Sequence, residues 1–454
     1  MGIDTLADAS RTLRAAYAGL PTPEEMDALI ADSYAAEARG YYDPQEDERL
    51  RENYARYLGI RTAIWQMIGT LRPKFKTFKS AKSSLSTDQL RAFGVAFCGA
   101  EIIVGTGQYL IRLARKRDIV WRKLDEAELH YGLKRKSFTR LYRQLTSVFK
   151  MRGFYEARYY FNENQEAILA ALESETLKPV TKILIHLQLR TASRDDHLKR
   201  YRRFVHFSLR RRRLSTGHKT MFMLFEATGS DIAELKIPLV KQPGAAKRVS
   251  AETLKRLKPQ LQPGDVFITR HDDAMSNLFL PGFWPHGALY IGSPEARSAM
   301  GVSDVSDGYK HSNDDVDILE AKKDGVLLRA LEETLQVDSF VVLRPKLSAL
   351  DITQALNRGL THAGKLYDFV FDFTTSDRLV CTEVIYRAYH GVGPIDFKLS
   401  TKAGRKCLSA EDLINQAISN DWFELVLIYG VQGNEFYEGS HARRTLSESF
   451  KSNF

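Results

Sequence analysis

The stretch GDVFITR, residues 264–270, is the first of four short runs that decide the fold class of the C-terminal half of this 454-residue chain. Each run is rich in β-branched or aromatic residues and is separated from the next by turn-forming residues, a pattern typical of β-strands. The other three runs are HGALYIG (286–292), DVDILEA (315–321) and SFVVLRP (339–345). The pattern predicts a sheet built largely from residues 264–345.

Three helical patterns follow the predicted strands along the chain. They are SALDITQALNRGLTHAGKL (348–366), TTSDRLVCTEVIYRAYHG (374–391) and SAEDLINQAIS (409–419). Ser409 and Asp412 have the spacing of a capping pair at the start of the last helix. Strands first and helices afterwards favour an α+β domain with an antiparallel sheet. We assign this domain to residues 261–432, preceded by a linker at 241–260 and followed by a polar C-terminal tail at 433–454.

Residues 1–240 are predicted to form an all-helical region of unknown role. Apolar residues recur at helical spacing in 137–161, with Ser137 as the expected N-cap, and again in 164–177. The most apolar window, Phe93 to Ile111, approaches membrane-spanning length but includes Glu101, and a carboxylate in mid-bilayer is costly. We therefore expect a buried helical hairpin of a soluble domain, with membrane contact as the alternative.

The net charge of +10 is concentrated in the middle of the chain. Residues 61–240 hold 35 Lys and Arg against 16 Asp and Glu. Residues 1–60 are acidic, with 6 Lys and Arg against 12 Asp and Glu. The first interpretation of this basic stretch is a solvated helix face, because charge runs on helices are common. Basic faces also attract polyanions, so the alternative is an anionic membrane surface as partner, ahead of nucleic acid because no nucleic-acid motif is recognised. The basic runs are RLARKR (112–117), LKRKSFTRLYR (133–143) and KRYRRFVHFSLRRRR (199–213).

Cysteine usage and the N-terminus indicate the compartment. Cys98, Cys381 and Cys407 lie far apart and form no CxxC pair, which indicates neither a disulfide scaffold nor a zinc ribbon. The N-terminus has acids where a secretory signal has bases. His271 with the two aspartates that follow it is not expected to hold a metal, because adjacent turn residues seldom converge on an ion. We expect a cytoplasmic protein, or one peripheral on the membrane, with no cofactor and no metal.

Cys381 is expected near the start of the helix predicted at 374–391. The residues ahead of it, Thr374 to Asp377, are of types that cap helices. A helix N-terminus together with an imidazole lowers the pKa of a thiol and makes it a nucleophile. The segment by itself favours a structural cysteine, because free cysteine is among the most buried residue types.

Candidate partners for the thiol lie upstream. His286 follows a proline at the start of the second predicted strand, where a core residue would normally be Val or Ile. Glu320 ends the third predicted strand and could accept the proton of the second imidazole nitrogen. A thiol, an imidazole and an orienting acid form the arrangement needed for nucleophilic acyl transfer. The alternatives are a hydrogen-bonded structural histidine and a solvent-facing edge charge.

The series QPGDVFITR, WPHGALYIG, DVDILEAKKDGV, GKLYDFVFD and RLVCTEVIYRAY resembles the circularly permuted papain-like amidases of the YaeF/YiiX type, in the wider NlpC-like superfamily. In that family an antiparallel sheet comes first and the cysteine-bearing helix last, so the chain order is histidine, polar residue, cysteine. This chain has that order. The resemblance covers residues 260–430 and implies that Cys381 is the nucleophile, His286 the general base and Glu320 the orienting acid.

Three further residues match motifs of that family and are candidates for site support. Tyr367 and Asp368 match a Tyr-Asp pair, and Glu383 matches the glutamate of C-[ST]-E. Tyr367 could donate to an oxyanion or fill the wall of the site, and we favour the wall. Glu383 competes with Glu320 for an electrostatic role, although two residues along a helix it is expected to point away from Cys381.

The resemblance implies a cysteine hydrolase, an amidase or peptidase-like enzyme, acting through a thioester acyl-enzyme. The backbone N–H of Cys381 would stabilise the oxyanion. The substrate would bear an amide or acyl group, in a peptide, a cell-wall fragment or a lipid. Lipid acyl transfer or lipid hydrolysis is an alternative, because apolar residues crowd the loop RHDDAMSNLFLPGFW (270–284). A second alternative is a catalytically idle papain-like module that the basic helices tether to a membrane or to nucleic acid.

Overall fold

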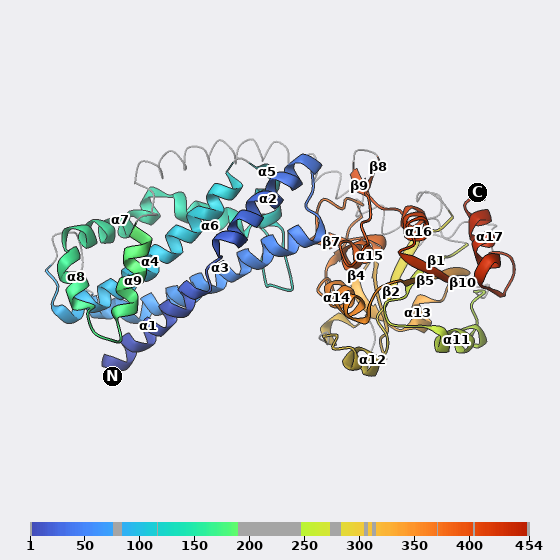
Figure 1. Ribbon diagram of the computed structural model, residues 1–454, viewed down its shortest axis with the longest axis horizontal. Coiled ribbons are helices and arrows are strands. Elements are labelled where there is room, and N and C mark those ends of the chain that lie inside the picture. Colours follow the sequence, from blue (N-terminus) through green and yellow to red (C-terminus); the bar gives the residue numbers. More distant parts are fainter. Residues whose placement is uncertain are drawn as a thin grey trace. The chain divides into compact units, whose positions relative to one another are not determined.

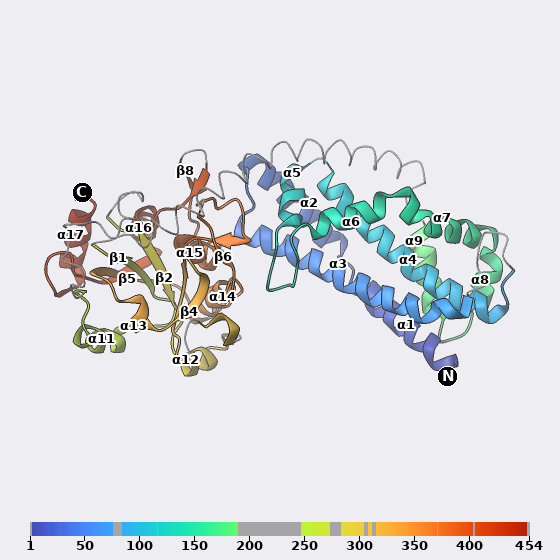
Figure 2. The ribbon, with the colours of Figure 1, turned by 180° about the vertical axis from the view of Figure 1, so that it is seen from behind.

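The computed structural model divides into two compact units, Met1–Ser215 and Thr216–Phe454 (Figures 1 and 2). The first is helical and the second contains an antiparallel sheet, which confirms the predicted fold class. The domain boundary predicted at residue 240 lies within 189–246, outside the described residues. The structure describes residues 2–75, 84–115, 117–188, 247–272, 283–303, 307–310, 315–369, 371–402 and 405–451.

The N-terminal unit is built from α-helices whose starts are set by local sequence. Helices α2 and α3 each begin with a proline, preceded by a capping residue, Thr22 or Asp43, that accepts a backbone hydrogen bond in a capping box. Proline suits this first helical position because its missing N–H would have no partner there. The helices are α1 (Gly2–Ala18), α2 (Pro23–Arg39), α3 (Pro44–Leu71), α4 (Thr87–Ala114), α5 (Asp118–Asp125), α6 (Ser137–Thr146), α7 (Val148–Glu163), α8 (Gln165–Ala171) and α9 (Lys178–Gln188), with a 3-10 turn, η1 (Arg72–Phe75).

The helices predicted in 137–161 and 164–177 are present as α6, α7 and α8. Ser137 is not the N-cap, because α6 begins at Ser137 and Lys136 occupies the cap position with a φ of 62°. Asp125 of α5 caps the helix instead, since its carboxylate accepts hydrogen bonds from the backbone N–H of Thr139, at 2.7 Å, and from the Thr139 hydroxyl. A side chain distant in sequence has therefore replaced the local cap.

The apolar window at Phe93–Ile111 forms part of one continuous helix, α4, and the predicted hairpin is wrong. Glycines in α4 give close packing rather than a turn: a Cβ at Gly99 would lie 2.7 Å from Ile64 of α3. Among the described residues, α4 alone is long and apolar enough to cross a membrane by length and composition, and 72% of its most apolar window is buried. Glu101 is buried too, 3.8 Å from Arg158 of α7.

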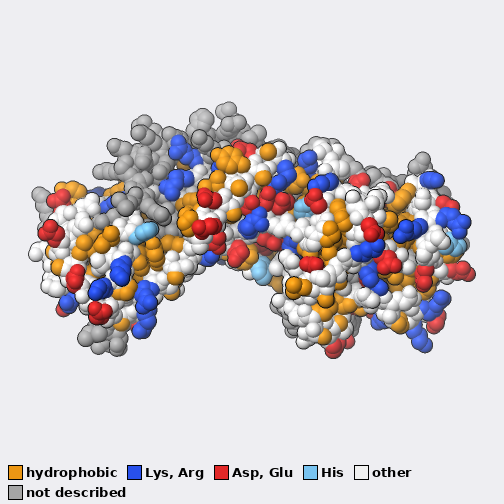
Figure 3. All heavy atoms as spheres, in the orientation of Figure 1, with side chains coloured by type: hydrophobic (Ala, Val, Ile, Leu, Met, Phe, Trp, Pro, Cys, Tyr) orange, Lys and Arg blue, Asp and Glu red, His pale blue; other side chains and the backbone are white. Residues whose placement is uncertain are grey.

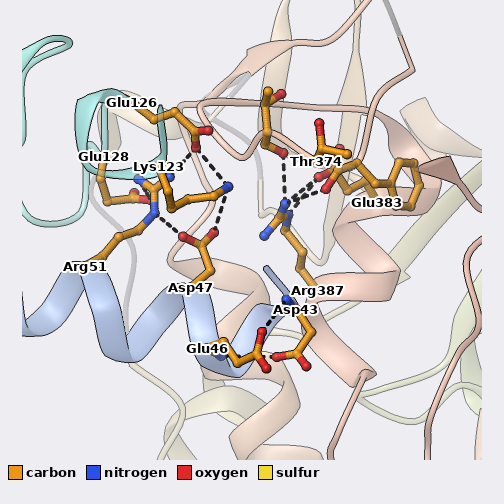
Figure 4. A network of polar contacts seen from close by, with 12 residues as sticks. Asp43, Glu46, Asp47, Arg51, Lys123, Glu126, Glu128, Thr374, Glu383 and Arg387 are labelled. Carbon is orange, nitrogen blue, oxygen red and sulfur yellow. Dashed lines mark hydrogen bonds and ion pairs between the residues drawn. The ribbon is translucent and has the colours of Figure 1, made fainter. Parts of the chain in front are cut away.

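A cluster of buried charges links α3 to α5 and the residues that follow it (Figure 4). We call this the Arg51 cluster; its members are Asp47, Arg51, Lys123, Glu126 and Glu128, all of them buried. Arg51 forms ion pairs with Asp47, at 2.6 Å, with Glu128, at 3.2 Å, and with Glu126. Lys123 forms further ion pairs with Glu126, at 3.1 Å, and with Asp47, at 3.7 Å. Each buried charge is thus paired with a charge of opposite sign.

The basic runs are only partly described by the structure. The run at 199–213 lies outside the described residues, as does Lys116 in the run at 112–117. In the run at 133–143 the side chains of Lys134, Lys136 and Arg140 are exposed. Figure 3 shows basic and acidic side chains interspersed over the visible described surface. Partner binding by this region stays a prediction.

The C-terminal unit is built around a seven-stranded sheet in the order β11-β10-β5-β1-β2-β3-β4, in which every neighbouring pair is antiparallel. The four runs quoted first are confirmed as β1, β2, β3 and β5. Strands β4, β10 and β11 were not predicted; Gly325 opens β4 with a φ of 113°, a conformation that favours glycine. The strands are β1 (Val266–Arg270), β2 (His286–Tyr290), β3 (Ile318–Lys322), β4 (Gly325–Arg329), β5 (Ser339–Pro345), β10 (Phe423–Tyr429) and β11 (Phe436–Tyr437).

Successive residues of a strand point to opposite faces of the sheet, and apolar residues occupy both faces here. Helices therefore cover both faces of the sheet. Val266 and Ile268 pack in one core with α14, α15, α16 and α17, whereas Phe267 packs in another with α11 and α13. The capping pair Ser409 and Asp412 opens α16 as predicted. The helices are α11 (Ala251–Leu257), α12 (Pro294–Ala299), α13 (Leu331–Thr334), α14 (Ala349–Leu360), α15 (Cys381–Tyr389), α16 (Ala410–Ser419) and α17 (Gly439–Ser449); the short strands are β6 (Leu366–Tyr367), β7 (Arg378–Leu379), β8 (Ser400–Lys402) and β9 (Arg405–Cys407); the 3-10 turns are η2 (Lys258–Gln260) and η4 (Asp307–Tyr309).

Two segments expected outside the domain core contribute to it. The end of the predicted linker forms α11, whose Leu257 is fully buried. The segment predicted as a polar tail supplies β11, which pairs with β10, and α17. Ala442 and Leu446 of α17 are buried because residues four apart share one face of a helix. The polar composition of this segment reflects the other face of an amphipathic helix.

Candidate active site

Cys381 is the first residue of α15. The expected caps, Thr374 to Asp377, do not cap this helix: Val380 is the N-cap residue, extended and without a side-chain cap hydrogen bond. Those residues instead precede β7, which pairs in parallel with β6 and leads directly into the helix. The Cys381 sulfur accepts hydrogen bonds from the backbone N–H groups of Gly287, in β2, and Thr382. A helix start without a side-chain cap is therefore available to a thiolate.

His286 opens β2 and lies between the thiol and the carboxylate of Glu320. Its Nε2 is 2.8 Å from Oε2 of Glu320, in the neighbouring strand β3, and the imidazole also forms a hydrogen bond with Cys381. Because Nε2 faces the carboxylate, Nδ1 is the ring nitrogen left for the thiol. Glu320 is fully buried and Cys381 almost so. The structure thus brings together the three residues predicted from separate segments.

The three groups shift one another's protonation. Burial alone would lower the pKa of His286, but the adjacent Cys381 and Glu320 raise it to about 9. Burial would raise the pKa of the Cys381 thiol, but the charge and hydrogen bond of His286 and the two backbone N–H groups bring it below its ordinary value. Burial opposes ionisation of Glu320 as well, and hydrogen bonding to His286 and the charge of Lys322 lower the pKa of Glu320 to about 2. These directions favour a thiolate beside an imidazolium.

Gly287 lets the cysteine helix approach the sheet. A Cβ at this position would lie 2.7 Å from Cδ1 of Ile385 in α15. That distance is too short for two carbon atoms, so a side chain at residue 287 would require the Ile385 side chain, or the helix that carries it, to move away from β2. The absence of a side chain therefore keeps the N–H of Gly287 within hydrogen-bond reach of Cys381.

Tyr367 and Asp368 lie at the end of β6 and in the turn after it. Burial raises the pKa of Tyr367 well above its ordinary value, and the negative charges of Cys381 and Asp368 add to the rise, so Tyr367 is close to the thiol. Its ring contacts Phe369, with centroids 5.0 Å apart, and Phe371, at 6.2 Å. Asp368 is buried and accepts the backbone N–H of Asp372 at 2.8 Å. Asp368 therefore shapes the loop that follows Tyr367.

Glu383 forms a buried ion pair with Arg387 one turn along α15, at 2.8 Å (Figure 4). Arg387 also donates hydrogen bonds to the backbone oxygens of Phe373, at 3.4 Å, and Thr375, at 2.9 Å. This pair ties the loop before β7 to the cysteine helix. Glu383 is accordingly engaged on its own helix, whereas Glu320 is the carboxylate that contacts His286.

The loop at 270–284, which is crowded with apolar residues, is described only at its ends. Leu278, Phe279 and Leu280 lie outside the described residues. Trp284 is fully buried, and its indole N–H donates to Oγ of Ser449 in α17 at 2.9 Å, so this residue anchors the loop. No group of three or more His, Cys, Asp or Glu side chains among the described residues could hold a metal ion.

At the other end of the loop, His271 lies near His286. Burial, followed by the charges of Lys247 and His286, lowers the pKa of His271 to about 4. Asp272 forms ion pairs with Arg248 and, at 3.3 Å, with Arg270.

Several residues around the site were missed by reasoning from sequence. Gly287 had a visible signal, because a glycine directly after the candidate histidine marks a close backbone approach in a strand. Lys322, Arg329 and Thr334 contact Glu320, and Arg387 contacts Glu383. Arg387, four residues after Glu383 on a predicted helix, and Lys322, two residues after Glu320 in the third predicted strand region, had spacings that sequence reasoning could have used.

Comparison with known proteins supports the resemblance noted in the sequence. Residues 260–447 match the family described as permuted papain-like amidase enzyme, YaeF/YiiX, C92 family. The match includes all six candidate site residues and none of the N-terminal unit's helices. No curated protein and no solved structure matches the chain.

Proposed function

We propose that this chain is a cysteine-dependent hydrolase, on the premise that residues 260–447 form a domain of the permuted papain-like amidase family. One observation carries the proposal, the hydrogen-bonded series from Cys381 through His286 to Glu320. An imidazole between a thiol and a carboxylate is the arrangement that activates a cysteine nucleophile. In this proposal Cys381 attacks, His286 transfers protons and Glu320 orients the imidazole.

In the first half of the reaction the Cys381 thiolate attacks the acyl carbon of the substrate. A carbon–sulfur bond forms and the carbonyl electron pair moves onto oxygen, which the backbone N–H of Cys381 at the start of α15 would stabilise. The intermediate then collapses and breaks the bond to the leaving group, which takes a proton from the His286 imidazolium. The product is a thioester on Cys381.

In the second half water attacks the thioester, and neutral His286 accepts its proton. Collapse of the second tetrahedral intermediate releases the carboxylic acid product and returns the sulfur as a thiolate beside the imidazolium. Glu320 remains a carboxylate throughout because the pKa of Glu320 is lowered to about 2. Its function is to hold the imidazole with Nδ1 toward the sulfur.

A second candidate is hydrolysis or transfer of an apolar acyl chain, as in a lipid hydrolase or acyltransferase. The aromatic contacts of Tyr367 with Phe369 and Phe371, together with Leu366, which is 54% exposed, favour this candidate. Apolar side chains beside a nucleophile suit an acyl chain. Incubation of the protein with a fatty-acyl thioester would load Cys381, and mass spectrometry would detect the adduct. An adduct formed equally fast with acetyl and fatty-acyl donors would contradict this second candidate.

The proposal is tested by thiol labelling of the folded chain with low-dose iodoacetamide. We expect Cys381 to be labelled before Cys407 and before Cys98, which is buried and whose thiol pKa is raised by burial. His286→Ala should slow labelling of Cys381 by about 100-fold, in keeping with the loss of a general base. His441→Ala, at an exposed position on α17, serves as the matched control and should label like the wild type. Slow labelling of all three cysteines at one rate would overturn the proposal and favour an idle module.

We further propose a cytoplasmic protein whose basic N-terminal unit binds anionic membranes peripherally. The net positive charge of residues 61–240 supports this proposal. The full chain should sediment with vesicles that contain phosphatidylserine at low salt and be released as salt is raised. Equal sedimentation with neutral vesicles, or none with either, would contradict it.

A further inference from the structure

The carboxylate of Glu320 has a second oxygen, Oε1, on the side away from His286. The Thr334 hydroxyl donates to it at 2.8 Å, Lys322 Nζ lies 2.6 Å from it, and Arg329 Nε forms a longer ion pair with it at 3.3 Å. They come from α13, β3 and β4 respectively. An orienting carboxylate needs only one contact with its imidazole, so this concentration of donors on the other oxygen calls for an explanation.

Strand geometry brings the two cations to Glu320. Lys322 lies two residues further along β3 and therefore on the same face of the sheet. Arg329 is opposite Ile318 in the β3–β4 register, which puts it on that face as well. Arg329 is almost fully buried and is also paired with Asp324 and Glu333. Lys322 is one-third exposed, and its ammonium group is the cation nearest to Glu320.

A fully buried carboxylate is costly to ionise unless opposite charge or hydrogen bonds surround it. If Glu320 took up a proton, it would lose the charge that stabilises the His286 imidazolium. If the carboxylate rotated, Oε2 would no longer face Nε2. The Thr334 hydroxyl and the two cations at Oε1 oppose both changes, because they stabilise the ionised form of Glu320 and hold Oε1 in place.

We propose that Lys322 is a positioning residue of the active site, which keeps Glu320 ionised and turned with one oxygen toward His286. Lys322 acts through Glu320 and does not touch the reacting atoms. Thr334 and Arg329 support the same orientation. This inference rests on the proposed function, because the orientation of the imidazole matters only if Cys381 is an activated thiol.

The sign of the expected effect follows from the charges around the site. Glu320 is faced by His286 from β2, Lys322 from β3, Arg329 from β4 and Thr334 from α13. His286 is in turn faced by Cys381 from α15 and by His271 after β1. Loss of one positive charge raises the pKa of each titratable group nearby. A plot of Cys381 reactivity against pH rises as the thiol loses its proton, and we call this rise the acid limb. Removal of the Lys322 ammonium group should therefore move the acid limb to higher pH.

The test measures the rate of iodoacetamide labelling of Cys381 against pH in the full folded chain. For Lys322→Met we expect the acid limb to move up by about one pH unit, so that labelling on the limb is about 10-fold slower. Lys322→Arg retains the charge and should superimpose on the wild type. Lys323→Met removes the same charge from the adjacent turn and is the matched control, with little shift expected.

A second variant separates orientation from charge. Thr334→Val removes the hydroxyl donor at constant charge, so we expect a lower plateau rate with an unmoved limb. A Lys322→Met protein whose limb superimposes on that of the wild type would overturn the inference, even if its plateau rate fell. A wild-type chain that shows no preferential, His286-dependent labelling of Cys381 would instead overturn the proposed function. The two failures are therefore distinguishable.

Discussion

The Arg51 cluster of the N-terminal unit and the surroundings of Glu320 in the C-terminal unit are buried charge clusters with opposite arrangements. In the first, a central cation is surrounded by three carboxylates. In the second, a central carboxylate is surrounded by Lys322, Arg329 and the Thr334 hydroxyl on one oxygen and by His286 on the other. Both arrangements compensate the cost of burying a charge.

The two clusters differ in whether one of the groups that pair with the central charge is an imidazole. The Arg51 cluster consists of carboxylates, one ammonium group and one guanidinium group, each paired within the cluster, so the cluster holds helices together. The cluster around Glu320 includes an imidazole, which can gain or lose a proton and whose second nitrogen faces a thiol. The same means of satisfying a buried charge therefore gives a structural joint in one unit and a candidate catalytic site in the other.

The largest effect is expected from Arg51→Met, which leaves three buried carboxylates around an apolar side chain. Breaking a buried ionic group in this way typically costs about 3–5 kcal/mol of stability. Hydrogen exchange of the backbone amides of α3 and α5 would measure the loss. Lys258→Met, at the half-exposed ion pair with Glu332, is the control and should cost about 1 kcal/mol or less. The rate of Cys381 labelling should not change in either variant, and a large decrease with Arg51→Met would break the contrast drawn between the two clusters.

A somewhat smaller effect is expected from Glu320→Gln. The pKa of Glu320 is lowered from 4.5 to about 2, so its ionised form contributes about 3 kcal/mol to the free energy of unfolding at neutral pH. A group whose pKa is lowered on folding contributes above its unfolded pKa, and the contribution is lost as pH falls. The stability difference between wild type and variant should therefore be fully present at about pH 5 to 6 and shrink toward pH 2, and it should also shrink at alkaline pH, because Glu320 helps raise the pKa of His286 to about 9. Urea unfolding at a series of pH values measures it, and a difference that grew on acidification would contradict the assignment.

The smallest effect is expected from Gly287→Ala, which adds one methyl group between β2 and α15. Overpacking of this kind typically costs about 1–3 kcal/mol, and labelling of Cys381 should slow because the helix start moves from the N–H of residue 287. Combining Gly287→Ala with Ile385→Val, which removes the atom that would clash, should restore part of the stability and part of the labelling rate. Thermal unfolding and the rate of Cys381 labelling would be measured for the single and the double variant. An unchanged labelling rate in Gly287→Ala would show that the close approach is not needed at the thiol.

Much of the C-terminal unit could be predicted because its sequence signals are local. Short apolar runs predict strands β1, β2, β3 and β5, and the Ser409 cap predicts the start of α16. His286 could be singled out because it stands where a core Val or Ile would be expected, and Cys381 and Glu320 because they offer it a thiol and an orienting acid. Their chain order also matches that of a known family, and residues 260–447 fit that family. The catalytic assignment itself stays a prediction.

Other features could not be predicted because they depend on residues far apart in sequence. The window at Phe93–Ile111 carries four glycines that suggest a turn, but Gly99 and Gly107 accommodate Ile64 and Leu145 from neighbouring helices, so the helix continues. The cap of α6 comes from Asp125 rather than from Ser137. The segment at 433–454 is polar in composition, yet one face of α17 is buried. In each case a tertiary contact outweighed a local preference.

The sequence by itself determined four of the strands and the helices that follow them, the helical character of the N-terminal unit and the identity of the candidate thiol, imidazole and acid, because periodicity and residue type are local properties. Only the tertiary structure decided that Nε2 of His286 faces Glu320, that Glu383 pairs with Arg387 instead, and that Lys322, Arg329 and Thr334 surround the buried carboxylate. The physical reason is that strand register and close packing, which no single segment encodes, set the distances on which charge and hydrogen bonding depend.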